Sequence, residues 1–196
     1  MNTKTRRLTT TALMSALTLI LGLTPIGFLT IPFTTIDITL MCLPVIIGAI
    51  VIGWKEGLLL GLLFALTSLF KALTAPSPLV AALLPYPLAL YPSIFIPRLL
   101  IPLVAYGVWR LTVRLPKAVS LGIAAAAGSL TNTALFLGMF YVLGAGPIAT
   151  QLGMTTGAVG ALLAGVVLTN GLPEAAVAVL LCVPIMYALQ KVIKKD

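Results

Sequence analysis

Long apolar stretches, separated by short polar or proline-rich segments, restrict most strongly how this chain can fold. Of its 196 residues, 60% are hydrophobic and only 8% are charged, whereas about a quarter of a soluble domain is charged. A transmembrane helix needs roughly 20 mostly apolar residues, so the chain has room for about six. The apolar runs do not alternate with a period of two, which argues against a membrane β-barrel. The sequence therefore predicts an all-α, polytopic membrane protein with one six-helix domain over residues 1–196.

Six helices follow from the positions of the apolar runs and of the residues that interrupt them. Their expected ranges are Leu8–Leu23, Ile38–Ile52, Leu58–Leu73, Ser93–Leu111, Ala118–Leu143 and Pro173–Leu189. Asp37 is placed to cap the second helix. The 35 residues from 157 to 191 are too long for one straight span. We therefore expect a break at Asn170 to Pro173, which leaves Ala158–Thr169 as a half-helix.

Two uncharged segments are expected to be loops. Seven of the fourteen prolines lie between Ala75 and Pro102. Because proline lacks an amide proton and restricts the residue before it, Pro76–Pro92 cannot form one continuous spanning helix. A short helix at Leu79–Leu84 fits within this segment, and a loop of such length commonly covers a binding site. The second loop is expected at Gly144–Thr156.

Basic residues gather at the ends of the apolar runs. With the N-terminus inside, ten of the twelve lie on the cytoplasmic side: Lys4, Arg6, Arg7, Lys55, Arg110, Arg114, Lys117, Lys191, Lys194 and Lys195. Cytoplasmic loops of membrane proteins are enriched in such residues, so both termini are predicted to be cytoplasmic. The net charge of +8 follows from this topology, and no basic domain for nucleic acid is expected.

Arg98 and Lys71 are the two basic residues outside this pattern. An arginine costs about 3 kcal/mol at membrane depth by insertion scales, so Arg98 is expected to face a protein cavity and to bind an anion there. Lys71 either extends to the membrane surface or contributes to the same anion site.

Further polar side chains reach the same outward-facing level from separate helices. The candidate substrate-binding residues are Arg98, Asn132, Asn170, Glu174, Lys71, Tyr86 and Tyr91. Asn132 either bonds a neighbouring helix or a ligand. Glu174 is a helix-terminal charge, a counter-ion for Arg98 or an acceptor for ligand hydroxyls, and the tyrosines either line the site or anchor the chain at the membrane interface. The arrangement predicts a small-molecule site that opens outward beneath the proline-rich loop.

Several function classes do not fit the composition. Histidine is absent, which removes the commonest general base and the commonest metal ligand. Cys42 and Cys182 lie within apolar runs as small core residues. No nucleotide-binding motif is present, so energy from ATP must come from another protein. We therefore predict no enzyme activity, no metal and no cofactor, while a self-coupled secondary transporter stays open.

Four segments resemble the substrate-binding S component of energy-coupling factor (ECF) transporters: Ala12-xxx-Ala16, Pro32–Gly57, Gly128–Gly138 and Thr169–Ala175. The likeness covers nearly the whole chain and is greatest to the pantothenate-specific members. It implies a vitamin bound from outside and a complex with a transmembrane coupling subunit and two cytoplasmic ATPase subunits. It also implies that the S component topples in the membrane to release its cargo, with Ala12 and Ala16 docking on the coupling subunit.

The chemistry of pantothenate fits the candidate residues. Its carboxylate suits Arg98, and its amide and hydroxyls suit Asn132, Asn170, Glu174 or the tyrosine hydroxyls. A neutral vitamin, such as pyridoxine or a hydroxymethylpyrimidine, would leave Arg98 to pair with Glu174. A folate would need an aromatic stacking slot, which a chain with 7% aromatic residues does not clearly offer. These vitamins remain the alternatives to pantothenate.

Overall fold

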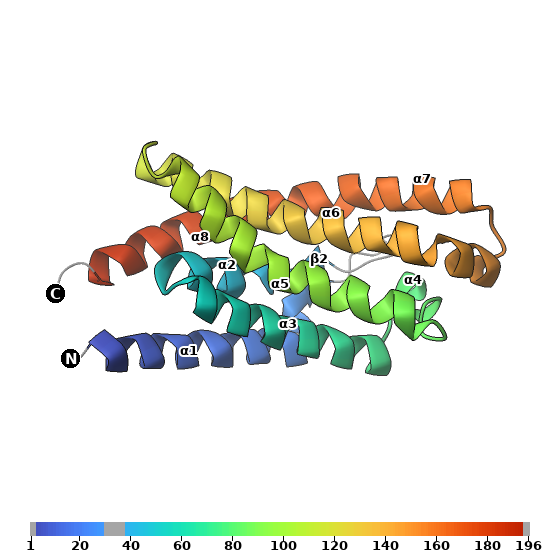
Figure 1. Ribbon diagram of the computed structural model, residues 1–196, viewed down its shortest axis with the longest axis horizontal. Helices are drawn as coiled ribbons and strands as arrows, with labels where there is room; N and C mark the ends of the chain where they lie inside the picture. The colour runs from blue at the N-terminus through green and yellow to red at the C-terminus, as the bar shows by residue number, and fades with distance from the viewer. Residues whose placement is uncertain (1–2, 30–37, 194–196) are drawn as a thin grey trace.

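A computed structural model of the chain describes residues 3–29 and 38–193. Its α-helices are α1 (Thr3–Leu23), α2 (Cys42–Val51), α3 (Trp54–Thr74), α4 (Pro78–Ala81), α5 (Pro87–Thr112), α6 (Lys117–Leu152), α7 (Thr156–Val166) and α8 (Leu172–Ile193). A 3-10 turn, η1 (Pro25–Gly27), follows α1, and a π-helical turn, η2 (Val167–Gly171), joins α7 to α8. The long helices lie lengthwise in one bundle, with α5 and α8 tilted against the others, and the start of α1 lies at the same end of the bundle as the end of α8 (Figure 1).

Four helical segments of the described chain are long and apolar enough to cross a membrane. They are Trp54–Thr74, Pro87–Thr112, Lys117–Leu152 and the joined segment Thr156–Leu189. The apolar helix α2 has only 10 residues, and the 21-residue α1 begins with a basic turn. The all-α class is therefore confirmed, whereas the count of six spans stays a prediction.

The second expected helix, Ile38–Ile52, begins later than predicted. Two-residue strands β1 (Phe28–Leu29) and β2 (Ile38–Thr39) pair antiparallel, with Phe28 opposite Thr39. Ile38 and Thr39 pair with β1, and the amide of Leu40 donates to the carbonyl of Gly27, so the helix starts only at Cys42, and no described side chain caps it. This pairing joins segments that are apart in the sequence, so local patterning does not reveal it. Asp37, the expected cap, lies outside the described residues.

The fourth expected helix, Ser93–Leu111, begins earlier than predicted. Helix α5 starts at Pro87 and continues through Pro92, Pro97 and Pro102, while the short helix before it spans Pro78–Ala81. Proline suits the first turn of a helix, where the amide needs no partner. The three internal prolines are spaced by five residues, and each removes one amide, which an apolar helix packed among others tolerates.

The second expected loop, Gly144–Thr156, is mostly helical. Helix α6 continues through Pro147 to Leu152 and ends at Gly153, whose φ of 64° is the left-handed conformation that closes many helices. A Cβ atom on Gly144 would lie 2.9 Å from a side-chain carbon of Leu83. Packing against the segment after α4 therefore stabilises the last turns of α6, and such a long-range contact is not visible in the composition.

The expected break at Asn170 to Pro173 is instead a wide helical turn. The amide of Leu172 donates to the carbonyl of Val167, five residues back, so η2 is continuous with α7 and α8. Pro173 offers no amide for a regular bond to Thr169, which favours the wider pattern. Figure 1 shows α7 and α8 running in different directions on either side of this turn. The location of the irregularity was predicted correctly and its form was not.

Helices α3 and α5 approach most closely beside Arg98. A Cβ atom on Gly61 would lie 2.5 Å from the carbonyl oxygen of Arg98, and one on Gly57 would lie 2.8 Å from the Cβ of Pro102. Glycines four residues apart allow two transmembrane helices to pack with their backbones close together. The turn of α5 that carries Arg98 is therefore held directly against α3.

We expect Gly61→Ala to lower the stability of the bundle by about 1–3 kcal/mol, because the added methyl group meets a backbone carbonyl that cannot rotate away. The measurement is the thermal unfolding midpoint of the detergent-purified protein. Gly107→Ala on α5 is the matched control, since nothing in the described structure lies within 4 Å of a Cβ there. A midpoint for Gly61→Ala equal to that of the control would contradict this packing.

Candidate functional site

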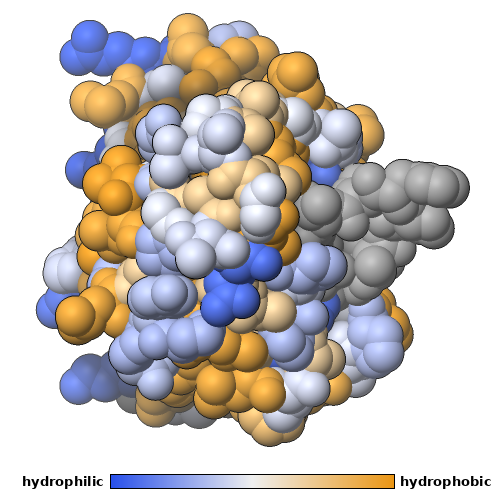
Figure 2. Space-filling view, turned by 90° about the vertical axis from the view of Figure 1, so that its right-hand side faces the viewer, coloured by the Kyte–Doolittle hydropathy of each residue, from blue (hydrophilic) through white to orange (hydrophobic). Residues whose placement is uncertain are grey.

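A cavity lined by both polar and apolar side chains lies among α3, α5, α6 and the η2–α8 segment, toward the end of the bundle that carries α4. The volume that the centre of a water molecule can occupy in it is about 90 Å³. Its polar lining residues are Thr39, Ser68, Lys71, Ser77, Arg98, Asn132, Thr133, Asn170 and Glu174, and its apolar ones include Ile94, Phe136 and Leu137. Figure 2 views this end of the bundle, where polar residues gather near the centre and hydrophobic residues lie around them.

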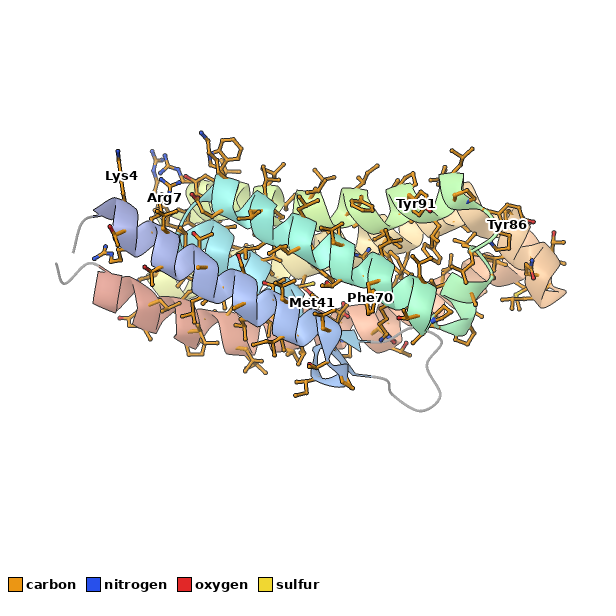
Figure 3. All side chains as sticks on the ribbon, turned by 90° about the horizontal axis from the view of Figure 1, so that it is seen from below. Lys4, Arg7, Met41, Phe70, Tyr86 and Tyr91 are labelled. Atoms are coloured by element: carbon orange, nitrogen blue, oxygen red, sulfur yellow. The ribbon has the colours of Figure 1, made fainter. Side chains whose placement is uncertain are left out.

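Five of the seven residues predicted to bind substrate line this cavity. They are Lys71, Arg98, Asn132, Asn170 and Glu174. Tyr86 and Tyr91 are not among the lining residues, and 38% and 47% of their respective surfaces are exposed. Both lie at the α4 end of the bundle, where α5 begins (Figure 3). The structure therefore brings the charged and amide candidates together but leaves the tyrosines outside.

The guanidinium of Arg98 is buried between two aromatic rings. Only 6% of the residue is exposed, and its Cζ lies 5.2 Å from the ring centre of Phe64 and 4.6 Å from that of Phe136. Its Nη1 donates a hydrogen bond of 3.1 Å to the carbonyl of Ser93. Ring faces attract a cation, and more strongly where water is excluded. The two rings and the carbonyl thus hold the charge at the cavity wall.

Glu174 lies on the opposite side of the cavity. One carboxylate oxygen accepts the amide N–H of Thr39 at 2.6 Å, and the other accepts the hydroxyl of Thr133 at 3.3 Å. The residue lies in the first turn of α8, directly after the wide turn η2. Within residues 3–29 and 38–193, no ion pair joins it to Arg98. Of the three alternatives for Glu174, the counter-ion of Arg98 is therefore not realised as a direct contact.

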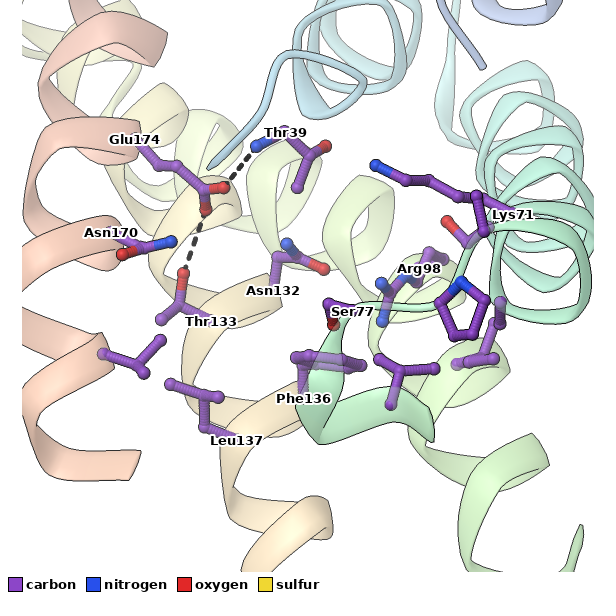
Figure 4. Close-up of a pocket in the computed structure, with 17 residues that line it drawn as sticks. Thr39, Lys71, Ser77, Arg98, Asn132, Thr133, Phe136, Leu137, Asn170 and Glu174 are labelled. Carbon is purple, nitrogen blue, oxygen red and sulfur yellow. Dashed lines mark hydrogen bonds between the residues drawn. The ribbon is translucent and has the colours of Figure 1, made fainter. Parts of the chain in front are cut away.

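Several buried polar atoms of the cavity lining lack a hydrogen-bond partner among the described residues. They are the Oγ of Ser68, the Nε of Arg98 and the Oδ1 of Asn132. Buried polar groups are nearly always paired, so unpaired ones gathered in one cavity indicate a place for a ligand or water. Figure 4 shows Lys71 and Arg98 on one side, Glu174 and Asn170 on the other, and Asn132 between them. The cavity suits a molecule with an anionic end and a hydroxyl-bearing end.

Sequence reasoning missed the residues that complete this site. Phe64 and Phe136 enclose Arg98, while Thr133 bonds Glu174. Helical spacing could have indicated them: Phe64 and Ser68 precede Lys71 by seven and three residues, and Phe136 follows Asn132 by four. Residues three or four apart share one face of a helix. Phe64, Ser68 and Phe136 therefore lie on faces marked by a polar residue already chosen, whereas Thr133 directly follows Asn132 and is not indicated by this spacing.

Ala12 and Ala16, the expected docking residues, are both exposed on α1. The opposite face of this helix is buried through Met14 and Thr18. Helix α1 lies at the edge of the bundle (Figure 1). The small residues therefore face away from the other helices of this chain.

Residues 6–186 match the family described as the ECF transporter, substrate-specific component. The chain is also similar to the pantothenic acid transporter PanT of Lactococcus lactis subsp. cremoris, with 33% identity over 163 residues that cover 78% of each chain. The family match extends over all the long helices and confirms the resemblance noted in the sequence. This chain belongs to the substrate-specific components of ECF transporters.

Proposed function

We propose that this chain captures pantothenate from the outer side of the cell membrane, as the substrate-binding subunit of an ATP-driven ECF importer. The observation that carries the proposal is the buried guanidinium of Arg98, which lines a cavity and has an unpaired Nε. The similarity to a pantothenic acid transporter supports the choice of vitamin.

The carboxylate of pantothenate binds Arg98. A guanidinium presents N–H groups in a planar fork that matches the two oxygens of a carboxylate. Each charge-assisted hydrogen bond contributes about 2 kcal/mol. Lys71 lies on the same side of the cavity and adds positive charge near this end of the ligand.

The hydroxyls and the amide of pantothenate bind the opposite side. Glu174 accepts hydrogen bonds there, and Asn170 and Asn132 offer both donors and acceptors. The unpaired Oδ1 of Asn132 is suited to the amide N–H in the middle of the ligand. The arrangement orients the vitamin along the line from Arg98 to Glu174.

The cavity end of the bundle faces outward, and both termini face the cytoplasm. Lys4 and Arg7 lie at the end of the bundle opposite Tyr86 (Figure 3), as the enrichment of positive charge in cytoplasmic segments requires. A transmembrane coupling subunit docks on Ala12 and Ala16, and two cytoplasmic ATPase subunits hydrolyse ATP. Toppling of this chain then releases the vitamin inward.

The test is a screen of the purified full chain against water-soluble vitamins by thermal shift. We expect pantothenate to raise the unfolding midpoint, since a ligand at a hundredfold excess over its Kd stabilises the folded state by about 2.7 kcal/mol. Pyridoxine, hydroxymethylpyrimidine and folate are expected to leave the midpoint unchanged. A shift with one of these and none with pantothenate would reassign the substrate.

Glu174→Gln is expected to weaken pantothenate binding roughly tenfold, because the amide has one acceptor oxygen where the carboxylate offers two charged ones. The Kd of the purified variant by calorimetry provides the measurement. Glu56→Gln is the control, because Glu56 pairs with Arg7 at 2.7 Å and is not among the lining residues of the cavity. Equal affinities of the two variants would remove Glu174 from the binding site.

A further inference from the structure

The hydrogen bond that anchors Arg98 uses a carbonyl that a proline has left free. In a regular α-helix, the amide of residue 97 would donate to the carbonyl of Ser93. Residue 97 is a proline inside α5 and has no amide proton. The carbonyl of Ser93 instead accepts the Nη1 of Arg98 at 3.1 Å. The side chain next to the proline thus takes the place of the missing backbone donor.

This contact limits how the guanidinium can turn. A helical side chain leans toward the start of its helix, so a long arginine at position 98 can reach the carbonyl of Ser93. Ser93 is fully buried, so its carbonyl needs a donor from the protein. The ring centres of Phe64 and Phe136 lie within 5.2 Å of the guanidinium carbon. The two rings therefore restrict the tilt of the guanidinium plane. The carbonyl restricts rotation within the plane.

We propose that Pro97 is a positioning residue for the anion site. By withholding an amide from Ser93, it leaves that carbonyl to anchor the guanidinium of Arg98 at the cavity wall, and the guanidinium N–H groups that do not bond Ser93 remain for the carboxylate of the ligand. This inference rests on the proposed function, and it assigns to Pro97 an effect on carboxylate recognition that exceeds its effect on folding.

The test restores the missing amide with Pro97→Ala and Pro97→Val, which share the new N–H and differ in volume. The probes are pantothenate and pantothenol, in which an alcohol replaces the carboxylate. We expect both variants to bind pantothenate roughly tenfold more weakly, the effect of losing one hydrogen bond to a charged group. Pantothenol binding should change less than twofold. The midpoint without ligand should be unchanged or higher, because proline disfavours a helix interior.

Pro92→Ala is the matched control in the same helix. Its missing amide would serve the carbonyl of Leu88, to which no side chain of the described residues donates. We expect Pro92→Ala to keep the wild-type preference for pantothenate over pantothenol.

Three results would overturn the inference. One is an unchanged preference for pantothenate over pantothenol in both Pro97 variants. Another is an equal loss of affinity for the two ligands together with a lowered unfolding midpoint, which would be a folding effect. The third is failure of both variants to fold, since restoring the amide should not destabilise the helix. If wild type binds no pantothenate, the proposed function fails as well. If wild type binds it and the Pro97 variants keep the preference, only the role of Pro97 fails.

Discussion

Arg98→Ala is expected to lower the affinity of the purified protein for pantothenate by at least a hundredfold. The substitution removes the guanidinium that would pair with the ligand carboxylate and leaves that carboxylate buried without a partner. Truncating one side of a buried charge pair costs about 3 kcal/mol or more, which is roughly a hundredfold in Kd. Calorimetric titration of the detergent-purified variant measures this loss.

Two comparisons separate recognition of the carboxylate from general damage. Pantothenol has no carboxylate to lose, so Arg98→Ala should reduce the difference in affinity between pantothenate and pantothenol. Arg110→Ala removes an arginine from the last turn of α5, and it should bind both ligands as wild type does. A titration in which Arg98→Ala matches wild type, or loses both ligands equally, would rule out a carboxylate on Arg98.

Ala12→Trp is expected to abolish uptake while the affinity for pantothenate is unchanged. Ala12 is exposed on α1 and does not line the cavity, so the bound vitamin should not sense the change. Close packing of two transmembrane helices needs small residues at the contact, and an indole there would hold the coupling subunit away. Uptake is measured in proteoliposomes that contain the complete transporter and ATP.

The control places the same indole elsewhere on the surface. Leu180 on α8 is 71% exposed, so Leu180→Trp should retain uptake. Uptake at the wild-type rate by Ala12→Trp would exclude Ala12 from the docking face. Proteoliposomes with this chain alone under an ion gradient should show no uptake, and uptake there would favour a self-coupled transporter.

The residues of the cavity could be predicted because the membrane restricts where polar groups can lie. Arg98, Asn132 and Glu174 are unusual within apolar runs, and the alternating direction of successive helices brings them to one level. Neither Tyr86 nor Tyr91 carried such a restriction, since tyrosine is also common at membrane interfaces. The position of a residue within an apolar run therefore identified the charged and amide residues of the cavity, but it could not tell whether a tyrosine lines the cavity.

The errors in the fold arose where stability depends on contacts between distant segments. Proline and glycine normally end helices, which led to loops being expected before Ser93 and after Leu143. In the structure, α5 tolerates its prolines, and α6 continues past Gly144, which packs on Leu83. The pairing of β1 with β2 has the same origin. A single sequence indicates the local conformational preference of each segment, whereas these elements are stabilised by contacts with distant segments.

The hydrogen bond that closes the wide turn η2 spans five residues, one more than in a regular α-helix. Successive residues of an α-helix are rotated by about 100°, so deleting one position from 167–171 would swing all of α8 through that angle about its own axis. Glu174 would then leave the cavity, and Cys182 and Met186, both fully buried, would leave the core in the same movement. Substitutions at exposed positions of this segment, such as Leu168, should therefore be tolerated better than any change in its length.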